Sequence, residues 1–307
     1  MAQRLAYVPV GLPHSGSDLL AAAAERHRAA FADAGVRLPA GSADEMFRAA
    51  VELRRDHRSW GLRRKDVEGV WAAVCRRAHR GRDHVMVGHD LLAGCTPDQV
   101  ALLVDGLAGF EVHVVVTATA PDPRVTLFPE DHDLLGVLDR WSAAVSAPDR
   151  IHVVVAGSHE RDDPASAWRA LGRVVGVATD GLVLPDPATL RRRADPTALR
   201  LMAEATGAMA SADDLRRLGE RWAVELAGSG HDVHGDPAAL VPAPSPTPPG
   251  SGAEPHLAGV TEALSATLSE TLAEVTRLRE RNRELEERTA RLERKRNRLK
   301  RRLAEAG

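Results

Sequence analysis

The sequence predicts an α/β fold in which a parallel sheet lies between two layers of helices, with a P-loop-like first turn. A Pro-rich linker and a C-terminal coiled coil are expected to follow. Short apolar runs alternate with helical patterns over residues 1–228, which is typical of βαβ units. Pro, Gly and Ser then dominate residues 229–256, and a leucine heptad fills residues 257–304. These three composition zones define the predicted domains.

Composition and charge narrow the class of protein. Only 3% of the 307 residues are aromatic, so Ala, Val and Leu must build the core. The net charge of −2 conceals an asymmetry: the tail from Leu257 carries 13 basic and 9 acidic residues, whereas the rest carries 28 basic and 34 acidic ones. An acidic body argues against nucleic-acid binding by the α/β domain. The Ala-, Gly- and Arg-rich usage favours a GC-rich genome.

Cysteine content and hydropathy predict a cytoplasmic protein. The chain has two cysteines, Cys75 and Cys95, both in apolar surroundings, as expected of reduced thiols. The N-terminus lacks the charged and apolar regions of a signal peptide. No window approaches the ~20 apolar residues of a membrane span, so no membrane span is expected.

The first turn has the plan of an anion-binding loop. An apolar strand pattern (5–10) breaks at a Gly/Pro-rich turn and reopens into an Ala-rich helix that continues to Ala34. Strand, glycine loop and helix together aim backbone N–H groups at an anion. The spacing from Gly11 to Gly16 fits. However, Ser17 stands where a nucleotide-hydrolysing P-loop has Lys, and Asp18 where Ser or Thr would coordinate magnesium.

The run from Gly11 to Asp18 resembles the Gly-Leu-Pro-Lys-Thr-Gly-Thr-Thr signature of the PAPS-dependent sulfotransferases. The resemblance implies that the loop binds the 5′-phosphosulfate end of PAPS (phosphoadenosine phosphosulfate), the sulfuryl donor. The implied donor-binding positions are Gly11, Leu12, Pro13, His14, Ser15, Gly16, Ser17 and Asp18. His14 stands in place of the family's Lys, serines replace two Thr, and Asp18 replaces the last Thr, so the resemblance implies a degenerate member. The helix dipole favours a carboxylate at Asp18 by ~0.3–1 kcal/mol, so Asp18 either takes the electrostatic place of a phosphate or is a capping residue.

The remaining elements follow in order. Residues 35–39 are expected to be an extended link. Helical patterns cover 45–53, 65–80, 96–107, 131–146 and 163–171, with Thr96 as N-cap and Pro97 in the first helical position. Strand patterns cover 85–92, 111–118 and 150–155. The resemblance spans about residues 5–178.

Two further comparisons with the family concern its substrate machinery. The step Gly88-His89-Asp90 resembles a Ser-His-Glu step, which implies a catalytic base at His89 with Asp90 as its neighbour. Adjacent residues of a regular strand point to opposite faces, so a capping role for Asp90 is the alternative. Thr119 stands where the family has an Arg for the donor 3′-phosphate, and the link between 118 and 131 is short.

Residues 195–227 form an amphipathic helical pattern, and the polar run 159–163 predicts a solvated turn. The following run, His231-Asp-Val-His-Gly-Asp236, contains two imidazoles and two carboxylates. Without further ligands these residues cannot close a four-coordinate metal site, and the segment predicts a loop with no metal.

The tail carries a heptad from Leu257 to Leu303. Leu fills six of its seven d positions, namely Leu257, Leu264, Leu278, Leu285, Leu292 and Leu299. With Asn282 at an a position, this pattern favours a parallel two-stranded coil and hence a homodimer; a single solvated helix is the alternative. The segment Arg294–Arg302 has seven basic residues in nine, which indicates an anionic partner such as lipid or nucleic acid.

Three functions remain open. The first is a sulfotransferase-like protein that has lost catalysis and acts as a binding or scaffold domain, without PAPS as a cofactor. The second is an active sulfotransferase that moves a sulfuryl group from PAPS to a hydroxyl or amine, with His14 as substitute cation and His89 as base. In the third, the coiled coil is the functional part, regulatory or DNA-associated, and the α/β body is passive.

Overall fold

The computed structural model describes residues 3–13, 15–58, 60–121, 125, 129–156, 164–186 and 210–242, all within one compact unit. Several predicted features lie outside the described residues: His14, the turn at 159–163, residues 195–209, residues 243–256 of the linker, the coiled coil and the basic segment Arg294–Arg302.

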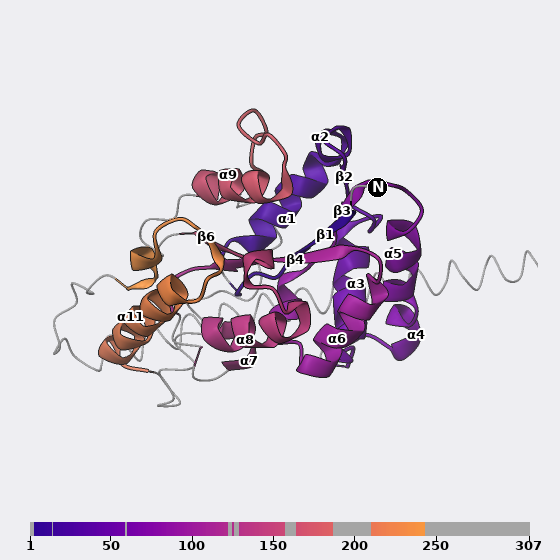
Figure 1. The fold of residues 1–307 in the computed structure, drawn as a ribbon. Helices are drawn as coiled ribbons and strands as arrows, with labels where there is room; N and C mark the ends of the chain where they lie inside the picture. Colours follow the sequence, from indigo (N-terminus) through magenta and orange to yellow (C-terminus); the bar gives the residue numbers. More distant parts are fainter. Residues whose placement is uncertain are drawn as a thin grey trace, which may run out of the picture. The chain divides into compact units, whose positions relative to one another are not determined.

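A six-stranded sheet with all neighbouring strands parallel organises this unit (Figure 1). In sheet order the strands are β2 (Val36–Arg37), β3 (His84–Met86), β1 (Leu5–Pro9), β4 (Glu111–Ala118), β5 (Ile151–Val155) and β6 (Asp232–His234). The central strands are buried on both faces, which explains their nearly continuous apolar sequences. The prediction of an α/β fold with a parallel sheet is confirmed.

One face of the sheet is covered by α1 (Ser17–Arg26), α2 (Arg28–Asp33) and α9 (Pro164–Val175) (Figure 1). Phe31 and Trp168 pack together in this layer with their ring centroids 5.8 Å apart. The predicted first helix is two helices, because the chain leaves helical geometry at His27.

The other face is covered by α3 (Ala43–Arg54), α5 (Val70–Ala78), α6 (Pro97–Gly106), α8 (Leu134–Val145) and α11 (Ala212–Gly228). The short elements are α4 (Arg64–Val67), η1 (Asp90–Gly94), α7 (Pro129–His132), η3 (Pro148–Arg150) and η5 (Pro237–Leu240). Trp141 and Trp222 are fully buried in this larger core. The predicted cap of α6 is confirmed: the Thr96 hydroxyl accepts the Gln99 N–H, and the Gln99 side chain accepts the Thr96 N–H.

Two edge strands correct the sequence analysis. The expected link at 35–39 contains β2, and the expected loop at 231–236 contains β6, each paired with its neighbour in the sheet. Strands of two or three residues are too short to show an apolar period, so the pattern missed them. Leu240 is fully buried in the core as well, so the folded body extends to at least Pro242, beyond the predicted boundary at 228.

Among the described residues, no helix combines the length and apolarity needed to cross a bilayer.

Candidate functional site

The carboxyl ends of β1, β3 and β4 meet at one edge of the sheet. After β1 the chain passes through α1 to β2 and β3, which lie on one side of β1 in the sheet. After β4 it passes through α7 and α8 to β5, which lies on the other side, so the strand order reverses between β1 and β4. Open α/β sheets bind ligands at such a switch point. The three segments there are residues 10–18, 87–90 and 117–121, and their sequences contain no Lys or Arg.

The first turn uses several of its hydrogen-bond donors inside the protein. The Val10 N–H donates to the Val115 carbonyl (2.8 Å), and the Leu12 N–H donates to the Thr117 carbonyl (2.9 Å). The sheet ladder therefore continues through Leu12. The hydroxyl and N–H of Ser15, which is buried, both donate to the Leu12 carbonyl, at 2.6 and 3.1 Å. These donors are directed away from any ligand outside the loop.

The space beside Gly11 is filled by Ser17. A Cβ atom placed on Gly11 would lie 2.0 Å from the Ser17 Cβ, so only glycine fits there. Gly16 is the N-cap of α1, with φ of 80° in the left-handed region, and no side chain caps the helix. Pro13 lies between them, half-buried, and His14 is outside the described residues.

Asp18 lies in the first turn of α1, where its Oδ1 accepts the Leu19 N–H at 2.9 Å. The capping interpretation of Asp18 was wrong in position, because Gly16 is the N-cap. The Asp18 carboxylate therefore accepts a hydrogen bond from an N–H group at the helix N-terminus that could otherwise donate to a bound anion. Within the described residues, the N–H groups of Gly16, Ser17 and Asp18 have no acceptor.

His89 and Asp90 form a dyad at the end of β3. His89 Nδ1 lies 2.6 Å from Asp90 Oδ1, and Asp90 is 7% exposed. The Leu91 N–H is shared between His89 Nδ1 (3.2 Å) and Asp90 Oδ1 (2.8 Å), so the backbone of η1 holds the two side chains together. The argument against their cooperation applied to a regular strand, and that condition is not met, because β3 ends at Met86 and η1 begins at Asp90.

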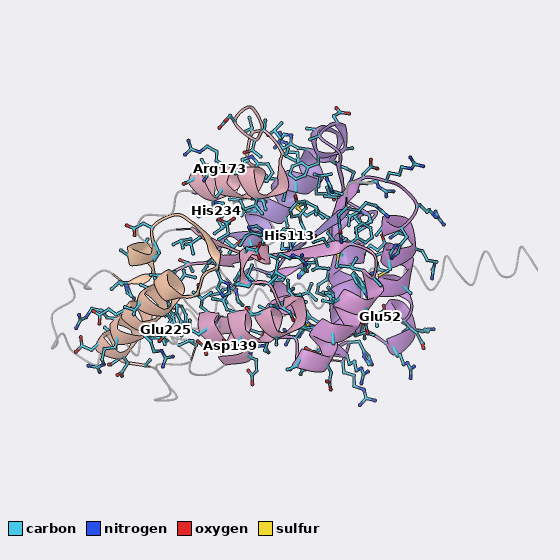
Figure 2. All side chains as sticks on the ribbon, in the orientation of Figure 1. Glu52, His113, Asp139, Arg173, Glu225 and His234 are labelled. Carbon is cyan, nitrogen blue, oxygen red and sulfur yellow. The ribbon has the colours of Figure 1, made fainter. Side chains whose placement is uncertain are left out.

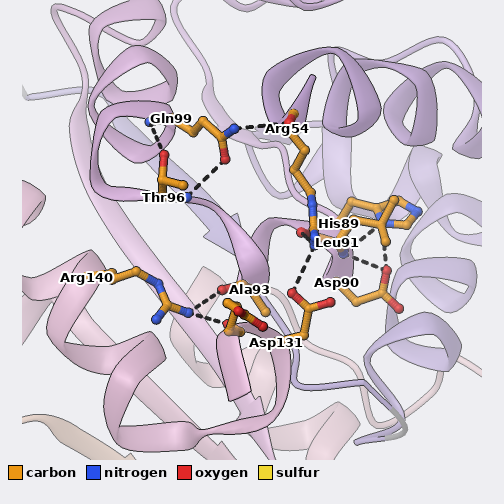
Figure 3. A network of polar contacts seen from close by, with 10 residues as sticks. Arg54, His89, Asp90, Leu91, Ala93, Thr96, Gln99, Asp131 and Arg140 are labelled. Carbon is orange, nitrogen blue, oxygen red and sulfur yellow. Dashed lines mark hydrogen bonds and ion pairs between the residues drawn. The ribbon is translucent and has the colours of Figure 1, made fainter. Parts of the chain in front are cut away.

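Two guanidinium groups hold η1 in place (Figure 3). Arg54 Nη1 donates to the Leu91 carbonyl (2.7 Å) and to Asp131 Oδ1 (3.0 Å), and Arg140 Nη2 donates to the Ala93 carbonyl (2.8 Å). Burial raises the pKa of Asp131, although Arg54 acts in the opposite direction. Asp90 is thus part of a rigid element, and the dyad geometry is set before any ligand arrives.

An aromatic surface adjoins the dyad. The Phe47 and His89 ring centroids lie 5.7 Å apart, and Trp60 meets Phe47 edge-on at 5.1 Å. Trp60 is 45% exposed, so this surface reaches solvent. A histidine held by a carboxylate beside aromatic rings has the chemistry of a general base next to an apolar or aromatic ligand.

The two cysteines carry no reactive thiolate. Both are buried and free. Burial raises the pKa of Cys75 to about 11 and that of Cys95 to about 12, so neither thiol ionises at neutral pH.

A second polar cluster crosses the sheet at β4, β5 and β6. It comprises Glu111, His113, His152, Asp232 and His234. Burial lowers the pKa of His152, while burial alone would raise the pKa of Asp232; hydrogen bonds from His152 and His234 outweigh that and lower it. The sequence analysis missed Glu111, His113 and His152. The available signal was the presence of polar residues inside otherwise apolar strands.

No family model matches the chain, and no curated protein matches it.

Proposed function

We propose that the α/β body is a sulfotransferase-like binding domain that has lost donor-dependent catalysis and is dimerised by the heptads of Leu257–Leu303. The observation that carries the proposal is the Asp18 carboxylate on the first turn of α1, bound to the Leu19 N–H. A carboxylate about 5 Å from a phosphate charge repels it by roughly 1–3 kcal/mol at effective dielectric constants of 80 to 20.

Missing cations add to this repulsion. Each charge-assisted contact removed costs about 1.5–3 kcal/mol, and the segments 10–18 and 117–121 lack both the Lys and the Arg of the resembled family. Losing two such contacts weakens donor binding by about two to four decades. The inward-turned hydroxyl of Ser15 and the Ser17 side chain against Gly11 support the same conclusion.

Calorimetry with PAPS tests the proposal on the full chain. The wild type is expected to show no saturation at micromolar donor. The variant His14→Lys/Asp18→Thr restores the charges of the motif and is expected to bind at least about 10-fold tighter. Asp44→Thr, which removes an exposed carboxylate of α3, is the matched control and leaves binding unchanged. Micromolar binding by the wild type would refute the proposal.

The second candidate, sulfuryl transfer from PAPS to a hydroxyl or amine, is favoured by the His89–Asp90 dyad beside Phe47 and Trp60. His89 would take the proton of the acceptor hydroxyl or amine as that group attacks the sulfur, and the S–O bond to the 5′-phosphate of PAPS would break to release phosphoadenosine phosphate. Donor binding that strengthens as pH falls through ~6.5 would identify His14 as the substitute cation. Transfer unaffected by both His14→Ala and His89→Ala would eliminate this mechanism.

The third candidate assigns function to the coiled coil, with the basic segment Arg294–Arg302 binding an anionic partner; both lie outside the described residues. Sedimentation of the full chain and of a chain ending at Pro242 separates the tail from the body. We expect a dimer for the full chain and a monomer for the truncated one. A truncated chain that stays dimeric would show that the tail is not the dimerisation element.

A further inference from the structure

Three side chains from the neighbouring strands β5 and β6 converge on one point. His152 Nδ1 lies 2.7 Å from Asp232 Oδ2, and His234 Nε2 lies 2.9 Å from the same oxygen. The three potential ligand atoms all lie within 4.8 Å of one another. His234 and His113, labelled in Figure 2, come from β6 and β4, on either side of β5.

The sheet register explains why these three residues meet. His152 pairs with Asp232, and Val154 pairs with His234. Because side chains alternate between faces along a strand, Asp232 and His234 share one face with His152. His231 precedes β6, and its Nδ1 is 3.2 Å from the Pro148 carbonyl oxygen, so it is not one of the converging side chains. The candidate ligands from β6 are therefore Asp232 and His234, two residues apart, and not the His-x-x-His pair of His231 and His234.

Asp236, the other acid of this segment, is a helix-capping residue and not a candidate ligand. Its Oδ1 accepts the Ala238 N–H at 2.9 Å and caps η5. The ligand that sequence reasoning lacked comes instead from β5, 80 residues earlier in the chain.

A chain of hydrogen bonds orients His152 from behind. His152 Nε2 lies 2.9 Å from His113 Nδ1, and His113 Nε2 lies 3.2 Å from Glu111 Oε1. If His152 Nε2–H donates to His113 Nδ1, then His113 Nε2–H donates to Glu111, and the lone pair of His152 Nδ1 faces Asp232. Metal-ligating histidines commonly donate their second N–H to an outer acceptor in this way.

Proton counting shows what this arrangement lacks. A neutral His152 has one N–H, yet its two nitrogens face His113 and Asp232. If the proton lies on Nδ1, then His113 Nδ1–H must donate to His152, and the contact between His113 and Glu111 needs a second proton on His113. Neutral imidazoles thus leave one contact without its proton. One further positive charge, either a proton or a metal ion between His152 Nδ1 and Asp232, completes the set, and the convergence of three ligand atoms within 4.8 Å favours the metal ion.

We propose that His152, Asp232 and His234 bind a first-row divalent cation, Zn²⁺ in the first instance, with His113 and Glu111 as positioning residues. Two imidazoles and one carboxylate match a three-ligand zinc site with an open fourth position. Tetrahedral ligands at about 2.1 Å from zinc are separated by about 3.4 Å. Asp232 Oδ2, now 2.7 and 2.9 Å from the two imidazole nitrogens, therefore moves about half an ångström away from them, which the half-exposed Asp232 side chain (47%) permits.

The burial pattern fits an ion that exchanges with solvent. The His152 side chain is 10% exposed and fixed by its partners, whereas Asp232 opens to solvent at the edge of the sheet. Water or an anionic ligand can take the fourth position from that side.

The test is a competition titration of the full chain, freed of metal by a chelator, with Zn²⁺ and a chromophoric chelator. The wild type is expected to bind one high-affinity Zn²⁺. Asp232→Asn and His234→Ala should each weaken this site by more than 100-fold. Glu111→Gln should weaken it by about 10–100-fold, the usual effect of an outer-shell partner.

His231→Ala is the matched control, since it removes a neighbouring histidine that contacts Pro148 and not the three ligand atoms, and it should leave the affinity unchanged. This control matters because the chain contains 13 histidines. Co²⁺ in place of Zn²⁺ should give a ligand-field spectrum that shifts in Glu111→Gln and disappears in His234→Ala. Equal Zn²⁺ binding by wild type, Asp232→Asn and His234→Ala would overturn the proposal, as would a loss in His231→Ala as large as theirs.

Discussion

Two regions of the sheet can be compared: the carboxyl ends of β1, β3 and β4, and the polar cluster on β4, β5 and β6. They differ in whether the local sequence predicts the ligand that the side chains can bind. At the carboxyl end of β1 a contiguous motif predicts an anion site. However, Leu12 and Ser15 donate their hydrogen bonds to groups inside the protein, and Asp18 adds a negative charge. At the cluster the run 231–236 supplies only Asp232 and His234, and the register of the sheet brings His152 to them. A motif specifies local geometry, whereas a ligand set depends on which side chains remain available.

The largest expected effect is a loss of stability when the Arg54 contacts that hold η1 are removed. Arg54→Ala removes the hydrogen bond to the Leu91 carbonyl and leaves the carboxylate of Asp131 without its cation. Removing one partner of a buried ion pair costs about 3–5 kcal/mol; because this pair is only partly buried, with side chains 18% and 26% exposed, the free energy of unfolding in urea should fall by about 3 kcal/mol, the lower end of that range. Arg48→Ala, which breaks the exposed pair with Asp44, should cost less than about 1 kcal/mol. Equal losses in the two variants would show that Arg54 does not support the dyad.

The second prediction concerns how much Zn²⁺ bound by His152, Asp232 and His234 stabilises the folded chain. Zn²⁺ at 100 times its dissociation constant should stabilise the wild type by about 2.7 kcal/mol, because it binds the folded chain. The melting temperature should rise accordingly in calorimetric scans and should not rise for Asp232→Asn. A nucleotide donor at the same concentration should leave the melting temperature of both proteins unchanged. A rise with the donor and none with Zn²⁺ would reverse the comparison.

A third variant tests whether Ser17 fills the first turn. Gly11→Ala places a methyl group 2.0 Å from the Ser17 Cβ, and such overpacking costs about 1–3 kcal/mol. The double variant Gly11→Ala/Ser17→Gly should recover most of that loss in urea unfolding. If Gly11→Ala alone is neutral, the loop is open and able to receive a ligand.

The smallest expected effect is a pH dependence. Because burial raises the pKa of Asp131 above its ordinary value of 3.8, the folded state holds a proton that the unfolded state has already released. The free energy of unfolding therefore decreases as pH rises from 3.8 through the raised pKa of the folded state. Asp131→Asn should flatten this slope in urea unfolding at pH 4 to 6. An unchanged slope would mean that another group causes it.

Long regular elements were predictable from the sequence. The strand at 111–118 has the bounds of β4, because a β-branched apolar run identifies a buried strand, and Thr96 with Pro97 marked the start of α6. The edge strands β2 and β6 were missed, since two or three residues show no period.

The candidate sites were predictable only in part. The sequence pointed to His89 and Asp90, but their contact depends on an irregular strand end that no pattern reveals. For the cluster, His152 and Asp232 are 80 residues apart, and only the pairing of β5 with β6 joins them. The order of strands in a sheet arises from packing of the whole chain, so residue spacing did not contain this information.

The most direct test of the central claim is a crystal structure of the full chain grown with PAPS. We expect no nucleotide density against residues 11–18, with the Ser15 hydroxyl still bonded to the Leu12 carbonyl and the Asp18 carboxylate still on the Leu19 N–H. Clear density for the 5′-phosphosulfate on the N–H groups of Gly16, Ser17 and Asp18 would contradict the account.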